Sequence, residues 1–156
     1  MNKIFKKITA MVTAAAMAAS ITSTVFADFV IDYKNVNDSA VVGMIDYYAS
    51  GRSEIVQQPT NYLIKETTRI DSAIYLSGGN AIKNVSRLQV DWQVVDYNTG
   101  ADFGKKREYE RKNAVLLEKE EQISINATIK QFTVFGAHIA TQSNTTIMAQ
   151  YTAVHN

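Results

Sequence analysis

The chain has 156 residues, no cysteine, a formal net charge of +1, and a composition that is 46% hydrophobic and 10% aromatic. The lack of cysteine excludes disulfides, thiol nucleophiles and cysteine metal sites within these residues. A nearly balanced charge is not typical of proteins that bind nucleic acids, so we expect no partner of that class.

The N-terminal residues have the pattern of a secretory signal peptide. Lys3, Lys6 and Lys7 precede an apolar stretch over 8–21, and Val25-Phe26-Ala27 supplies small residues for cleavage. A retained anchor is the alternative, but Thr and Ser interrupt the stretch, which falls short of the ~20 apolar residues that a membrane span needs. We therefore expect residues 1–27 to be removed, leaving no stable membrane anchor and a secreted protein, extracellular or associated with the cell surface.

The remaining residues are slightly acidic and long enough for one domain. Three of the 16 Lys and Arg residues lie in 1–27, so 13 remain against 15 Asp and Glu, a net charge of about −2. A chain of this length can bury a core of its own without disulfides.

Residues 28–60 carry the only helical pattern and are expected to precede the main domain. Asp38 and Ser39 are good helix N-caps. The apolar residues that follow recur at three- to four-residue spacing and predict one short helix: Val41, Met44, Ile45 and Tyr48. Residues 51–60 contain the sole proline, Pro59, and are predicted to be a linker.

The stretch 88–97 organises the rest of the chain. Leu88, Val90, Trp92 and Val94 alternate with polar residues, which predicts a half-buried strand with these four side chains in the core. A glycine-containing turn follows, and residues 107–113 are the predicted partner strand of a hairpin.

Further alternating segments predict an antiparallel β-sandwich. They lie at 70–76, 123–129, 132–139 and 147–153 and are separated by turn residues. With no helix of crossover length between them, we predict an all-β, Ig-like sandwich of six to seven strands over residues 61–156. Two alternatives stay open: a helical turn within 113–122, and a bulge or bend at Gly136.

Catalytic motifs are lacking in this sequence. Its two histidines are His138, in an apolar strand where a structural role is expected, and His155, close to the end of the sequence. The turn 96–102 has oxygen side chains at alternate positions, but its spacing fits a hairpin turn better than a calcium loop. We predict no catalytic residues, no metal and no cofactor, and keep a carboxylate-based hydrolase as a third possibility.

Tyrosine and a charged run supply the candidate binding residues. The run 105–112 carries five cations and two glutamates and could bind an anionic polymer, although alternating charge also protects a strand edge from aggregation. Exposed tyrosines could stack on sugars or partner side chains, although cross-strand packing is the commoner role. The predicted ligand-binding residues are Tyr75, Tyr97, Tyr109, Lys105 and Arg107.

From residue 58 onward the order of features resembles uncharacterised small secreted β-sandwich proteins of Gram-positive gut bacteria. The matching features are Pro59 closely followed by Tyr62, the segment 74–79 ending in Ser-Gly-Gly, and the threonine-containing strands of 139–154. Residues 28–57 have no counterpart in the resemblance, and the run 105–112 is more charged than usual. The resemblance implies a small Ig-like sandwich and no known activity.

These features predict a secreted, non-enzymatic recognition module. Its expected partner is a cell-wall or glycan polymer or another protein. The alternative is a structural or self-assembling extracellular protein, in which strand edges or the N-terminal segment pair between copies.

Overall fold

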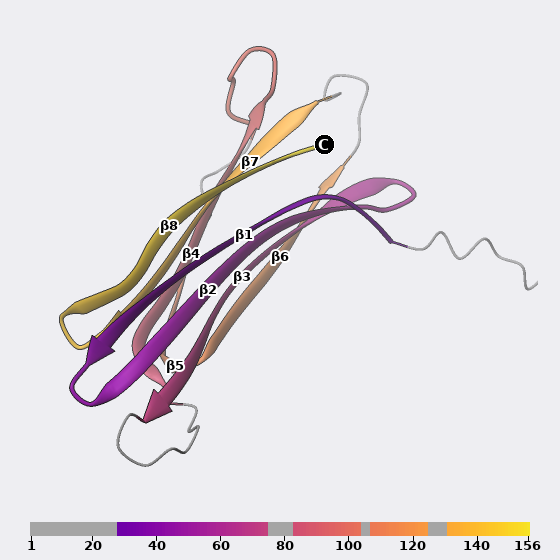
Figure 1. Cartoon of the computed structure of the whole chain (residues 1–156). Coiled ribbons are helices and arrows are strands. Elements are labelled where there is room, and N and C mark those ends of the chain that lie inside the picture. The colour runs from indigo at the N-terminus through magenta and orange to yellow at the C-terminus, as the bar shows by residue number, and fades with distance from the viewer. Residues whose placement is uncertain (1–27, 75–82, 104–106, 125–130) are drawn as a thin grey trace, which may run out of the picture.

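The computed structural model describes residues 28–74, 83–103, 107–124 and 131–156, and these form an all-β protein of eight antiparallel strands in two sheets (Figure 1). The first sheet has the order β1 (Phe29–Val42), β2 (Ile45–Gln57), β3 (Asn61–Ile74) and β6 (Leu116–Ser124). The second has the order β5 (Arg107–Ala114), β4 (Val85–Asp96), β7 (Phe132–Gln142) and β8 (Thr145–His155). The predicted all-β class is confirmed, with eight strands instead of six to seven. The Ig-like subtype is not confirmed, because in constant-type Ig domains the fifth strand lies beside the second, whereas here β3 does.

The predicted N-terminal helix and linker are wrong, because residues 29–57 form the two strands β1 and β2. Gly43 has φ +67° in the tight turn that joins them, a conformation that glycine adopts without strain. Val41, Met44 and Tyr48 are exposed, so their helical spacing does not mark a buried face. Residues 51–57 continue β2 and pair with β3, so they belong to the sandwich and do not lead into it.

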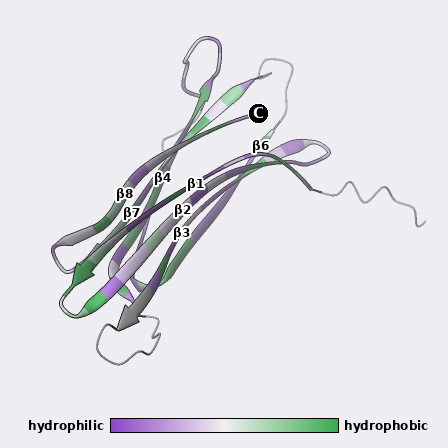
Figure 2. Cartoon of the chain, viewed as in Figure 1, coloured by the Kyte–Doolittle hydropathy of each residue, from purple (hydrophilic) through white to green (hydrophobic). Residues whose placement is uncertain are grey.

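The central hairpin has the predicted form. β4 pairs with β5 from Val85–Ala114 to Trp92–Arg107, and Leu88, Val90, Trp92 and Val94 are buried in the core. Residues 113–122 form no helical turn; Asn113, at φ 50°, is the second-last residue of β5, just before the sharp reversal into β6. Figure 2 shows hydrophobic and hydrophilic residues mixed along the strands of both sheets, as expected where each sheet buries one face.

Side chains connect the two sheets along both sides of the sandwich. On one side β1 lies alongside β8 (Figure 1), where Gln150 Nε2 donates to Asp38 Oδ2 at 3.2 Å and the His155 N–H donates to Asp32 Oδ2 at 2.9 Å. On the other side Arg107 of β5 contacts Glu121 of β6 at 2.6 Å.

The pairing of β7 with β8 has no shift at Gly136, where a bulge or bend was predicted. The register shifts instead between Ala140 and Thr141. Among the described residues no helix is long and apolar enough to cross a membrane.

Candidate functional site

Two of the predicted binding residues, Tyr109 and Arg107, make contacts between the two sheets. The Tyr109 ring stacks on the Trp92 indole with centroids 5.2 Å apart, and Lys119 Nζ of β6 lies 4.8 Å from the centroid of the Tyr109 ring. The Arg107 guanidinium makes a two-pronged contact with the Glu121 carboxylate, which raises the arginine pKa. Both side chains therefore bridge β5 and β6. Tyr75 and Lys105 lie outside the described residues.

Tyr97 is placed differently, on the outer side of the second sheet. It follows β4, is 60% exposed, and packs edge-on against the imidazole of His155 with centroids 5.7 Å apart. The turn after it is organised by Asp96, whose carboxylate accepts hydrogen bonds from the backbone of Asn98 and Thr99. These bonds lower the pKa of Asp96 and give its carboxylate the role expected in a hairpin turn. No group of three or more described His, Asp or Glu residues is arranged to hold a metal.

The outer face of the second sheet carries a line of aromatic side chains that the sequence did not reveal. The strand register places His155, Phe135, Tyr151 and Ile139 in successive rows across β7 and β8, with Tyr97 at one end. Phe135 is 49% exposed and Tyr151 is 77% exposed. We call Tyr97, His155, Phe135, Tyr151 and Ile139 the aromatic stripe.

Polar side chains of β4 border the aromatic stripe. Gln89, Asp91 and Gln93 point outward because their neighbours Leu88, Val90, Trp92 and Val94 point into the core. Gln89 Nε2 donates to Asp91 Oδ2 at 2.7 Å, whereas Asp91 Oδ1 is shielded from solvent and has no hydrogen-bond partner among the described residues. A hollow of about 260 Å³ lies between the stripe and this border. Its lining includes Asp91, Trp92, Gln93, Phe135, Ala137 and Tyr151.

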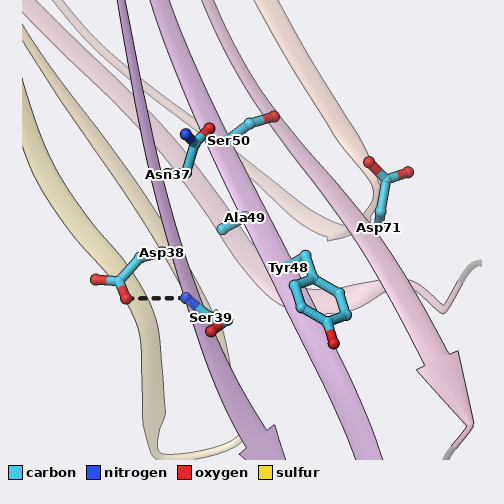
Figure 3. Close-up of a pocket in the computed structure, with 7 residues that line it drawn as sticks. All are labelled: Asn37, Asp38, Ser39, Tyr48, Ala49, Ser50 and Asp71. Carbon is cyan, nitrogen blue, oxygen red and sulfur yellow. Dashed lines mark hydrogen bonds between the residues drawn. The ribbon is translucent and has the colours of Figure 1, made fainter.

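A second hollow, of about 440 Å³, lies on the outer face of the first sheet (Figure 3). Tyr48 is its aromatic residue and is 52% exposed; Asn37, Ser50 and Asp71 stand around it on three adjacent strands. Figure 3 shows Asp38 directed away from Tyr48, with the hydrogen bond from the Ser39 N–H drawn to its carboxylate. This hollow therefore offers a single ring among small polar groups, unlike the aromatic stripe.

The residues that most resemble a catalytic centre are sealed between the sheets. Ser53 of β2, Glu66 and Thr68 of β3, His138 of β7 and Thr152 of β8 are all buried. Ser53 Oγ donates to Glu66 Oε2 at 2.5 Å and lies 3.2 Å from His138 Nε2, and the Thr152 hydroxyl lies 2.5 Å from Ser53 Oγ. We call these five residues the polar cluster.

Two glycines make room for the polar cluster. A Cβ atom on Gly51 of β2 would lie 2.4 Å from the His138 ring, and one on Gly136 of β7 would lie 2.5 Å from both Ser53 Oγ and Thr152 Oγ1. Gly51 precedes Ser53 by two residues in β2, and Gly136 precedes His138 by two residues in β7. Gly51 faces His138 and Gly136 faces Ser53, so each glycine makes room for the polar side chain of the other strand. The backbone of Gly136 also lines the hollow beside the aromatic stripe.

The geometry of the polar cluster does not match a hydrolytic triad. In a triad the acid orients one imidazole nitrogen and the nucleophile faces the other. Here Ser53 and Glu66 both lie on the Nε2 side, with Glu66 Oε2 at 3.4 Å, and Nδ1 faces the Thr68 hydroxyl at 3.1 Å. Burial raises the pKa of Glu66 to about 8 and lowers the pKa of His138 to about 4. The pair is therefore uncharged near neutral pH and forms a structural hydrogen-bond network.

The missed residues left only a weak signal in the sequence. Phe135 stands between Val134 and Gly136 in a continuous apolar run, so alternation alone did not separate inner from outer positions. Alternation counted from the buried His138 puts Gly136 on the inner face of β7 and Phe135 on the outer face. The count requires that the burial of His138 is already known. Ser53 and Glu66 lie on adjacent strands, and only the β2–β3 register brings them opposite each other.

Fold and site together define an antiparallel two-sheet protein with a sealed polar cluster and an open aromatic face. Comparison of the chain with protein-family models, characterised proteins and solved structures finds no match.

Proposed function

We propose that this protein is a secreted, non-enzymatic recognition module that binds a cell-surface polymer, glycan or protein partner through the aromatic stripe. The observation that carries the proposal is the exposure of Phe135 and Tyr151 beside one hollow on one sheet face. Rigid aromatic side chains lose little conformational entropy on binding and supply large contact areas, which is why they dominate many interfaces.

The arrangement of neighbouring residues supports binding at this face. Small side chains occupy the outward positions between and beside the rings, at Ala137, Ala149 and Ala153. The rings therefore stand above a surface of small side chains. A partner can therefore reach the faces of the rings as well as their edges. An exposed apolar surface rimmed by polar residues is typical of an interaction site.

A binding function is also favoured over catalysis by the state of the ionisable groups. The buried pair Glu66 and His138 has no charge near neutral pH, and a fully buried Ser53 cannot reach a polymer outside the sandwich. Secretion rests on the signal-peptide pattern of residues 1–27. The Ig-like assignment is proposed only as a distant likeness of architecture, and the binding proposal does not depend on it.

Self-assembly through strand edges is less well supported. The N-terminal segment was expected to be able to pair between copies, but its strand β1 runs along β8 and is joined to it by the hydrogen bonds to Asp32 and Asp38. A covered edge is a poor template for strand addition.

Binding can be tested by retention of the protein, without residues 1–27, on insoluble cell-wall preparations, glycan arrays and immobilised surface proteins. The double variant Phe135→Ala/Tyr151→Ala should lose retention at least tenfold, while Tyr48→Ala, which removes an exposed tyrosine from the other sheet, should be retained like the parent protein. Equal retention of the double variant, or no retention of the parent protein by any of these materials, would overturn the proposal. Unchanged melting temperatures of both variants would show that they fold.

A further inference from the structure

We infer that the aromatic stripe binds an uncharged glycan, either as a polysaccharide chain or as an oligosaccharide, and not an anionic wall polymer. This inference rests on the proposed function and names the chemical class of its ligand. Three features of the second sheet carry it: the spacing of the rings, the polar border, and the sign of the surrounding charge.

The spacing of the rings suits consecutive sugar units. Phe135 lies opposite Ala153, and Tyr151 lies opposite Ala137, so the two rings stand diagonally across β7 and β8. Diagonal neighbours on one face of a sheet are about 7–8 Å apart at their backbones. Sugar rings present apolar C–H faces that stack on aromatic rings, and a separation of this order lets one chain contact both.

The polar border supplies hydrogen-bonding groups of the kind that sugar hydroxyls require. A hydroxyl donates one hydrogen bond and accepts others, so it pairs with both carboxylates and amides. Asp91 and Gln93 both line the hollow, and Gln93 lies opposite Phe135 in the β4–β7 register. Gln93 Nε2 is held by Asp102 Oδ2 at 3.0 Å, which fixes the amide in place beside the stripe. Fixed polar groups beside apolar rings give a site its orientation and specificity.

The charge near the hollow opposes an anionic ligand. Asp91 pairs with Glu108 across β4 and β5 and points to the same side of the sheet, and Asp102 contacts the neighbouring Gln93. Among the described residues on this part of the face, the nearest cations in the register are Arg87 and Lys112. Both contact Glu110, at 2.7 Å and 3.8 Å. Phosphate or carboxylate groups would meet like charge here, whereas a neutral glycan would not.

The test is affinity electrophoresis in native gels that contain one soluble polymer each. Neutral probes are a β-glucan, a mannan, a xylan and a starch; anionic probes are polygalacturonate and a teichoic acid. We expect retardation by at least one neutral probe. It should be lost in Phe135→Ala/Tyr151→Ala, be reduced severalfold in Asp91→Ala, and be unchanged in Tyr48→Ala. Retardation should also be the same at 50 and 300 mM salt, because no ion pairs form on binding.

The outcomes separate this inference from the proposed function. If the aromatic double variant loses binding only to anionic probes, or only to an immobilised protein, the glycan inference is wrong and the recognition face stands. If no binding of any kind depends on Phe135 and Tyr151, both are wrong. Retardation by a neutral probe that persists in the double variant would place glycan binding elsewhere and also overturn the inference.

Discussion

Glu66 Oε2 lies 3.4 Å from His138 Nε2, and both side chains are completely buried between the two sheets. Removing a carboxylate or an imidazolium from water is costly, so the fold favours the uncharged form of each group. Burial accordingly raises the pKa of Glu66 to about 8 and lowers that of His138 to about 4. The stability of the protein should therefore depend on pH through this pair.

The direction follows from proton uptake in the folded and unfolded states. Above its ordinary pKa of 4.5 the unfolded Glu66 loses its proton while the folded residue keeps it, so its contribution declines as pH rises towards 8. Below its ordinary pKa of 6.5 the unfolded His138 gains a proton while the folded residue does not, so its contribution declines as pH falls towards 4. The two trends offset each other between 4.5 and 6.5.

We predict that the contribution of this pair to the free energy of unfolding is nearly constant from pH 4.5 to 6.5 and falls by about 2 kcal/mol from pH 6.5 to 8. Urea unfolding at pH 5.5, 6.5 and 8 measures it. Glu66→Gln keeps the shape but cannot ionise, so its stability should be less sensitive to pH over the same interval. An alkaline loss of equal size in Glu66→Gln and the parent protein would contradict the assignment.

Gly136 should not tolerate a side chain. The Cβ atom of Gly136→Ala would lie 2.5 Å from Ser53 Oγ and Thr152 Oγ1, so the strands must shift, at a cost of about 1–3 kcal/mol. Ala137→Ser, at the adjacent outward position, is the control and should change stability by less than about 0.5 kcal/mol. Chemical denaturation compares the free energies of unfolding of the two variants. Equal changes would show that the polar cluster has space for a methyl group at Gly136.

Gly51 and His138 should be energetically coupled, because the Cβ of Gly51→Ala would collide with the imidazole. Removing the ring in His138→Ala also removes the collision. The double variant should therefore be less destabilised than the sum of the single variants, by about 0.5–3 kcal/mol. Simple additivity in urea unfolding would argue against direct contact.

Trp92 should be a major source of stability. It is only 2% exposed and stacks on Tyr109 in the core, so Trp92→Ala should cost about 3–5 kcal/mol. A thermal melt of the variant measures this, and an almost unchanged melting temperature would mean that the indole is not buried.

Arg107 should contribute little either to stability or to recognition. Its contact with Glu121 is partly exposed to solvent, and such ion pairs are worth about 0–1 kcal/mol. Arg107→Ala should leave polymer retention unchanged. Loss of retention in this variant, with normal folding, would restore the binding role that the sequence suggested.

The parts of the fold that alternation governs could be predicted, and the parts that long-range pairing governs could not. Leu88, Val90, Trp92 and Val94 alternate with polar residues, and their burial followed from that pattern. Val41, Met44 and Tyr48 matched a helical period by coincidence, because they are exposed positions at the end of a hairpin that tertiary pairing determines.

The candidate site was harder to predict because strand register creates it. Tyr97 was expected to be exposed, and it is; Tyr109 was expected on the same outward side, but its cross-strand neighbour is the buried Val90, and its ring packs on Trp92. Phe135 and Tyr151 come from different strands, and no local pattern indicates that both face outward beside one hollow.

The most direct test of the aromatic stripe as the binding face is a calorimetric titration of the protein with a polymer that retains it. The parent protein and Tyr48→Ala should show a change in heat with the same midpoint, and Phe135→Ala/Tyr151→Ala should show no change at these concentrations. The opposite pattern, with the change lost in Tyr48→Ala and kept in the double variant, would place the binding face on the first sheet and contradict the proposal.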